Sequence, residues 1–168
     1  MTRRRQFHVN CLWGVLCFSL CSWFCTPLYP NLPNLGLADW DQHLFYHASV
    51  LETLAQYEQA PLWNPWYCGG CPMLQNPQVP LISPAYLLAV AFELPVAMKI
   101  AIWLHYILAL LGILLLARLV YKIKNGVLAI YAGSIFFLNS HISLQLSEGH
   151  TWILPAAYIP YLFLGFEK

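Results

Sequence analysis

Residues 100–117 read IAIWLHYILALLGILLLA, and this stretch decides the fold class. It contains no aspartate, glutamate, lysine or arginine. As an α-helix it would be about 27 Å long, close to the ~30 Å thickness of the hydrocarbon core of a bilayer. The stretch therefore predicts a helix that crosses a membrane.

The composition of the whole chain points to the same class of protein. Of its 168 residues, 60% are hydrophobic and only 9% are charged, whereas soluble domains carry about 25% charged residues. So few charges cannot form the surface of a soluble domain of this length. The composition excludes an ordinary cytosolic domain, a highly charged disordered chain and a nucleic-acid-binding protein with a basic stripe.

Three more apolar segments accompany the first, and we expect spans over residues 9–26, 100–117, 126–141 and 152–166. No small-residue cleavage site follows residues 9–26, so we interpret this segment as an uncleaved span rather than a secretory signal. Basic residues precede the first span and follow the second, at Arg3, Arg4, Arg5, Arg118, Lys122 and Lys124. They favour the cytoplasmic side of the membrane.

This orientation predicts a cytoplasmic N-terminus, an extracytoplasmic loop over 27–99, a cytoplasmic loop over 118–125 and an outer loop over 142–151. Residues 79–98 are apolar enough to span, but a span here would move the basic residues after residue 117 to the outside. Ser83 and Pro84 form a typical N-cap and first-turn pair, so we expect an interfacial or re-entrant helix over residues 84–92.

The expected fold is therefore all-α: a single transmembrane domain over residues 1–168, with about four transmembrane helices. Amphipathic or interfacial helices occupy the first outer loop. One of them is predicted over residues 42–59, where Pro61 follows its end, and its apolar stripe comprises Leu44, Ala48, Leu51 and Ala55.

Asp39 and Asp41 directly precede this amphipathic helix and are the first carboxylates of the chain. Two such carboxylates suit Mg²⁺ or Mn²⁺, and one of them near the membrane surface suits a general base that accepts a proton from a hydroxyl. The alternative is structural: Asp41 is the N-cap of the helix and Asp39 is a solvated loop residue.

Histidine and cysteine occur together in the same loop. His43 and His47 share a helix face, and Cys68 and Cys71 form a CxxC pair. These are ligand types of a zinc site, but a Cys68–Cys71 disulfide is the better interpretation on the oxidising side of the membrane. Two reduced thiols in a tight turn are the remaining alternative.

The second outer loop is the other polar cluster on the outer side. Hydrogen-bond donors, acceptors and titratable groups lie in or beside it at Asn139, His141, Gln145, Glu148 and His150. His141 and His150 suit the binding of a phosphate or a metal, or the transfer of a proton. The alternative is that this segment is polar only because a loop between two spans is exposed to water. His105 lies inside a span, where we interpret it as a neutral, hydrogen-bonded histidine rather than a haem ligand, because no partner histidine lies at its depth.

Several short motifs together resemble a known family. They are Asp39-Trp40-Asp41 after the first span, the run WNPWYCGG over 63–70, PMLQNPQ over 72–78, SPAYLL over 83–88, and Glu148-Gly149-His150. The chain is similar to the N-terminal part of bacterial GT-C superfamily proteins, which are multi-spanning membrane glycosyltransferases. Members typically take a sugar from a polyprenyl-phosphate carrier on the extracytoplasmic side.

The resemblance implies roles for particular residues. Asp39 or Asp41 is the expected catalytic base, and Asp39, Asp41 and His150 are the expected ligands of a divalent cation. The expected substrate- and carrier-binding residues are Glu148, His150, His141, Asn76, Gln78 and Trp63. The implied partners are the lipid bilayer and a polyprenyl-phosphate-linked sugar, and no nucleic acid.

Members of the family are far longer than 168 residues, so the resemblance implies a fragment of a longer protein. A second hypothesis comes from another class. The chain is then a small non-catalytic membrane subunit that helps to assemble a larger complex through its aromatic outer loop.

Overall fold

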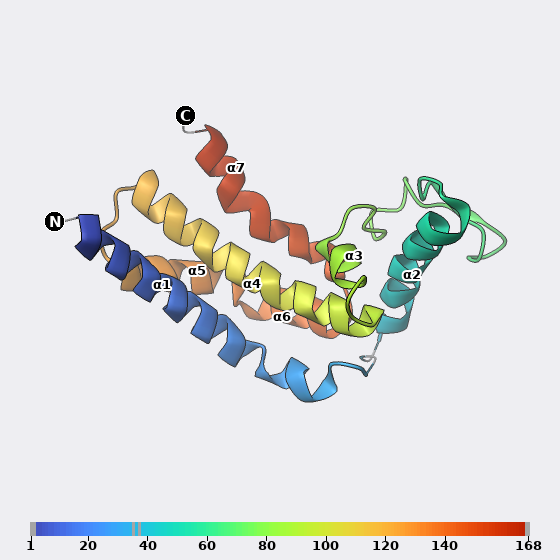
Figure 1. Cartoon of the computed structure of the whole chain (residues 1–168), viewed down its shortest axis with the longest axis horizontal. Coiled ribbons are helices and arrows are strands. Elements are labelled where there is room, and N and C mark those ends of the chain that lie inside the picture. The colour runs from blue at the N-terminus through green and yellow to red at the C-terminus, as the bar shows by residue number, and fades with distance from the viewer. Residues whose placement is uncertain (1–2, 35, 37, 167–168) are drawn as a thin grey trace. The chain divides into compact units, whose positions relative to one another are not determined.

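The computed structural model describes residues 3–34, 36 and 38–166, and these residues are mostly helical. The only strands within them are β1 (Trp63–Asn64) and β2 (Cys71–Pro72), which pair antiparallel. The helices are α1 (Arg3–Phe24), η1 (Thr26–Asn31), α2 (Trp40–Tyr57), α3 (Pro84–Leu88), α4 (Leu94–Leu119), α5 (Gly126–Phe137), α6 (Ser140–Ser147), η2 (Thr151–Tyr158) and α7 (Ile159–Phe166), where η marks a 3-10 helix (Figure 1). The prediction of an all-α protein is confirmed at this level.

The chain forms two compact units. The first comprises the described residues of Met1–Pro30, Trp103–Ile142 and Leu154–Lys168, and the second comprises Asn31–Ile102 and Ser143–Ile153. In the first unit, α4 packs against three other helices. Its Trp103 ring lies 5.2 Å from that of Phe18 in α1, its Leu110 lies against Gly133 of α5, and its Leu108 carbonyl accepts a hydrogen bond of 2.8 Å from Tyr161 of α7.

Length and apolar composition identify few candidate spans in the described residues. Only α4 is long and apolar enough to cross a membrane as one helix, and α5 with α6 passes the same test as a pair bent by 43°. Cys11–Phe24 and Thr151–Phe166 are apolar but shorter.

The helix boundaries differ from the predicted ones in several places. The helix over 100–117 begins earlier, at Leu94, so that Pro95 stands in its first turn. Residues 142–147 were predicted as loop but belong to α6. Ser83 caps α3 as predicted, because its Oγ accepts a hydrogen bond of 3.2 Å from the amide of Ala85. However, α3 ends at Leu88 rather than at residue 92.

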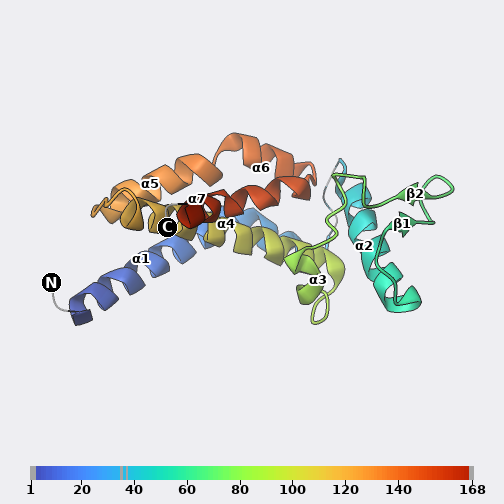
Figure 2. The ribbon, with the colours of Figure 1, turned by 90° about the horizontal axis from the view of Figure 1, so that it is seen from above.

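The second unit has α2 and the β1–β2 hairpin side by side (Figure 2). The predicted apolar stripe of α2 is wrong: Ala55 is exposed, and the buried face carries Trp40, His43, Tyr46, His47, Ser49, Val50 and Thr53. Several of the polar side chains on this face are hydrogen-bonded. Ser49 donates to the Phe45 carbonyl, and Asn64 of β1 donates to Ser49 Oγ at 3.2 Å.

Candidate functional site

Asp39 lies at the N-cap position of α2, but its carboxylate does not cap the helix. The alternative with Asp41 as N-cap is wrong, because α2 begins at Trp40 and Asp41 belongs to its first turn. Asp41 Oδ1 accepts a hydrogen bond of 2.8 Å from the amide of Gln42. Asp39 is therefore the carboxylate that its own helix leaves available.

The Asp39 carboxylate instead contacts His150, which is 111 residues away in sequence. Its Oδ2 lies 3.1 Å from His150 Nε2. The Asp39 side chain is 54% exposed and the His150 side chain 19%. The pair thus combines a solvent-accessible carboxylate with a largely enclosed imidazole.

The other ring nitrogen of His150 faces two more side chains. His150 Nδ1 lies 2.8 Å from Gln145 Oε1 and 3.7 Å from Glu148 Oε2. Oxygen atoms on both sides of the ring suit an imidazolium that donates from both nitrogens. A neutral ring that donates to Asp39 fits equally once the Gln145 amide presents its nitrogen. Either way, Gln145 and Asp39 fix the plane of the ring.

The backbone brings the two ends of this contact together. The Asp39 amide donates to the Glu148 carbonyl at 3.0 Å, and Trp40 Nε1 donates to the Ser147 carbonyl at 3.1 Å. Gly149 directly precedes His150 and has a φ of +96°. A Cβ on Gly149 would lie 2.7 Å from the backbone nitrogen of Trp40. Only glycine allows the turn after α6 to approach α2 this closely.

His43 lies beside this pair, on the next turn of α2. Its side chain is buried at 1% exposure, and its ring centroid is 5.5 Å from that of His150. Its Nδ1 is buried without a hydrogen-bond partner in the described residues. Burial lowers the pKa of His43, and His150 lowers it further, whereas Asp39 acts in the opposite direction. His43 is therefore a neutral neighbour of the site at neutral pH.

His47 is buried deeper in the same unit. Its Nδ1 lies 2.9 Å from the His43 carbonyl, and burial lowers its pKa to about 4. Within the described part of the chain, no group of three or more His, Cys, Asp or Glu side chains is arranged to hold a metal ion.

Cys68 lies in the hairpin turn between β1 and β2, and Cys71 is the first residue of β2. Cys68 has φ +49° and is exposed, and the two following glycines also have positive φ. Cys71 is half-buried, and the two thiols are not bridged in this structure.

Among the remaining predicted site residues, Asn76, Gln78 and Trp63 have local contacts of their own. Asn76 Oδ1 accepts a hydrogen bond of 2.9 Å from the amide of Gln78 and so shapes a turn. Trp63 is 53% exposed and packs over Gly70 in the hairpin. His141 is exposed and belongs to the first compact unit.

Gln145 was recognised in the sequence as a member of the polar cluster, but Gly149 and Trp40 were not predicted as site residues. Trp40 was visible as the aromatic neighbour of Asp39 and Asp41. Nothing in the sequence alone shows that Gly149 requires a positive φ. No protein-family model matches the chain, and no curated protein or solved structure is significantly similar to it.

Proposed function

We propose that the chain is part of an integral-membrane glycosyltransferase of the GT-C kind, with Asp39 as its general base. One observation carries the proposal: the Asp39 carboxylate is half-exposed, is not used to cap its helix, and is held by His150 from the other predicted outer segment. The motifs over residues 39–41, 63–70, 72–78, 83–88 and 148–150 support the choice of family. The substrate class is a sugar linked to polyprenyl phosphate, and the acceptor is an extracytoplasmic hydroxyl.

In the proposed reaction, the acceptor oxygen forms a bond to the anomeric carbon of the sugar. The bond from that carbon to the carrier phosphate oxygen breaks, and its electron pair leaves with polyprenyl phosphate. Asp39 accepts the proton of the acceptor hydroxyl. His150 orients the Asp39 carboxylate, and Gln145 fixes the His150 ring.

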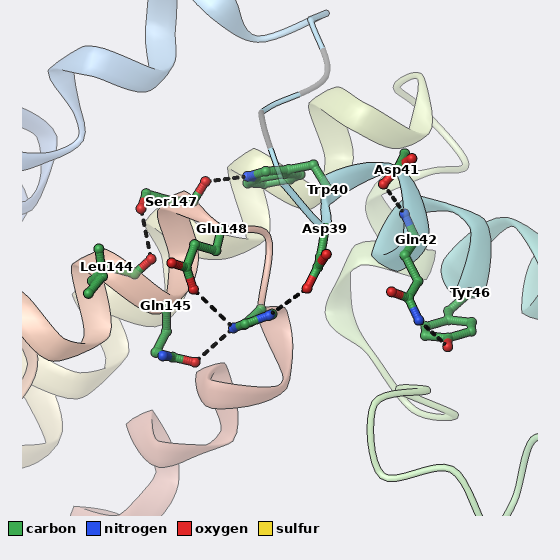
Figure 3. A network of polar contacts seen from close by, with 10 residues as sticks. Asp39, Trp40, Asp41, Gln42, Tyr46, Leu144, Gln145, Ser147 and Glu148 are labelled. Carbon is green, nitrogen blue, oxygen red and sulfur yellow. Dashed lines mark hydrogen bonds and ion pairs between the residues drawn. The ribbon is translucent and has the colours of Figure 1, made fainter.

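The predicted cation ligands do not form one set in this arrangement. Asp41 accepts a hydrogen bond from the amide of Gln42, at the start of its own helix (Figure 3). Asp39 and His150 contact each other directly. A divalent cation, Mg²⁺ or Mn²⁺, therefore stays a prediction, and the proposed steps use the chain's own residues.

The proposal includes a membrane arrangement. The spans are α1, α4, the bent pair α5–α6, and η2 with α7, in a bacterial plasma membrane with the N-terminus in the cytoplasm. α4 supports it most strongly because of its length and apolar composition. The segment before α4, which contains Asp39, and the turn that carries His150 then lie on the extracytoplasmic side, where lipid-linked sugars are used.

The test compares two neighbouring aspartates in the full chain, reconstituted in liposomes. The donors are radiolabelled polyprenyl-phosphate hexoses and pentoses, and the acceptors are cell-envelope glycan and glycolipid fractions. We expect Asp39→Asn to lower kcat by about 10²–10⁴-fold, as loss of a general base does. Asp41→Asn is the matched control and should stay within about threefold of the wild type, since its carboxylate lies outside the contact.

Equal losses in both variants, or none in either, would contradict the role of Asp39. A folded wild-type chain that transfers sugar from none of these donors would sink the enzyme proposal. That result would favour the second hypothesis, in which the chain is a non-catalytic membrane subunit that helps to assemble a larger complex.

A further inference from the structure

Lys99 is a cation in an unusual place. It lies in the second turn of α4, and its side chain is only 4% exposed. Burial of an ammonium group is costly unless the charge is compensated. Lys99 makes no ion pair with a carboxylate of the described residues. Its charge must therefore be compensated in another way.

Backbone carbonyls provide that compensation. Lys99 Nζ donates to the carbonyl oxygens of Asn31 and Asn34, and lies 3.3 Å from that of Leu32. An ammonium group has three donors, so all of them are used on one short segment. Lys99 thus has no donor left for an anionic ligand, and its contacts are with its own chain.

The same ammonium lies over the indole of Trp40. Lys99 Nζ is 5.6 Å from the ring centroid, within the range of a cation–π interaction. Gly36 also packs against this indole, since a Cβ there would lie 2.2 Å from Trp40 Cδ1. Trp40 is buried at 4% exposure. Lys99 therefore holds two segments at once, Asn31–Asn34 and the first residue of α2.

Trp40 connects this cation to the candidate site. It directly follows Asp39, and its Nε1 donates to the Ser147 carbonyl. The next carbonyl, that of Glu148, accepts from the Asp39 amide. A shift of the Trp40 indole therefore changes both backbone links that bring Asp39 to His150.

We propose that Lys99 is a positioning residue, which fastens the Asn31–Asn34 segment and Trp40 and thereby holds Asp39 against His150. The inference rests on the proposed function where it concerns the reaction. The tether itself is a structural property and is testable without any substrate.

The first test follows the tether in the full chain reconstituted in nanodiscs. Lys99→Met removes the donors and the charge, Lys99→Arg keeps a cation, and the exposed Lys124→Met is the matched control. Hydrogen exchange is measured at the Asn34 and Asp39 amides, which bond to the Asn31 and Glu148 carbonyls. Trp40 is followed by fluorine NMR of 5-fluorotryptophan, assigned with Trp40→Phe.

We expect Lys99→Met to speed exchange at both amides by about tenfold or more, because local opening becomes easier, and to shift the Trp40 signal. Lys99→Arg and Lys124→Met should change exchange by less than about twofold. Amides of α5 report global unfolding. Unchanged exchange and an unchanged Trp40 signal in Lys99→Met would overturn the tether, and equally faster exchange in α5 would show a general stability role and overturn it as well.

The second test separates positioning from folding in the sugar-transfer assay. Lys99→Met should lower kcat by about tenfold or more while KM changes less than about threefold, because a misplaced base slows the chemical step. Lys99→Arg should recover most of kcat. Faster hydrogen exchange at the Asn34 and Asp39 amides of Lys99→Met, together with a wild-type kcat, would overturn the positioning role. If the wild type transfers no sugar, the proposed function fails, and the exchange and fluorine data still decide the tether.

Discussion

His47 is a buried imidazole whose surroundings keep it neutral. Its ring packs 5.6 Å from that of Tyr86, and burial lowers its pKa from 6.5 to about 4. The unfolded chain takes up a proton on this residue near pH 6.5, whereas the folded chain does so only near pH 4. The unfolded state therefore binds more protons within this window, so stability falls as the pH is lowered through it.

We expect His47 to remove about 3 kcal/mol of the free energy of unfolding between pH 6.5 and 4. His47→Phe keeps an aromatic ring against Tyr86 and should flatten the pH dependence. The exposed His141→Phe is the control and should leave the slope as in the wild type. Denaturant unfolding at several pH values measures this, and parallel curves for wild type and His47→Phe would contradict it.

His150 and Glu148 offer a comparison at the site itself. His150→Asn removes the contact with Asp39 and should lower kcat for sugar transfer by about 10²-fold, since the base loses its orientation. Glu148→Gln changes only a long contact of 3.7 Å from a side chain that is 44% exposed. Glu148→Gln should therefore change kcat for sugar transfer by less than about threefold. A larger loss for Glu148→Gln than for His150→Asn would contradict the assignment.

At the scale of elements, the start of α2 decides which aspartate is available. The sequence contains both Asp39 and Asp41, but their spacing is compatible with a helix that begins at 40 or at 42. A start at Trp40 leaves the Asp39 side chain outside the helix and turns Asp41 back onto it. The local sequence pattern therefore identified both aspartates as candidate site residues. The contact with His150, which is distant in sequence, distinguishes Asp39 from Asp41.

The buried face of α2 was harder to predict for a related reason. Periodicity of apolar residues assumes that polar side chains face water. Ser49, Thr53 and His47 instead satisfy their hydrogen bonds on the helix backbone and on Asn64. Caps with local partners, such as Ser83 before Pro84, were predictable because both members lie within three residues.

Gly149 and Gly69 provide a matched pair of turn glycines. Both have positive φ, but a Cβ on Gly149 would lie 2.7 Å from the Trp40 backbone, whereas one on Gly69 would meet nothing within 4 Å. Gly69→Ala should cost about 1 kcal/mol of strain. Gly149→Ala should cost about 1–3 kcal/mol and should also abolish most of the transfer activity. If thermal unfolding gave the same loss of stability for Gly69→Ala and Gly149→Ala, the turn after α6 would not be closely packed against α2.

At the scale of the whole molecule, the predicted topology is testable with a native cysteine. Cys68 is exposed in the hairpin turn, so a membrane-impermeant maleimide should label it in intact cells treated with an impermeant reductant, and Cys68→Ser should remove that label. A cysteine introduced by Lys122→Cys should react only after permeabilisation. Labelling of Lys122→Cys in intact cells would reverse the proposed orientation.

The same experiment tests the predicted Cys68–Cys71 disulfide. If the two thiols are bridged on the oxidising side, Cys68 should label only after an impermeant reductant is added. Immediate labelling without reductant would contradict the disulfide and leave the orientation intact.

The distance of 111 residues between Asp39 and His150 has a consequence for biosynthesis. A ribosome adds about 5–20 residues per second, so Asp39 leaves it several seconds before His150 is made. During that interval the start of α2 has no partner from the α6 turn, and closing so long a loop carries an entropic cost that local helices do not bear. The helices of the chain can thus form early, while the candidate site is assembled among the last features of the nascent protein.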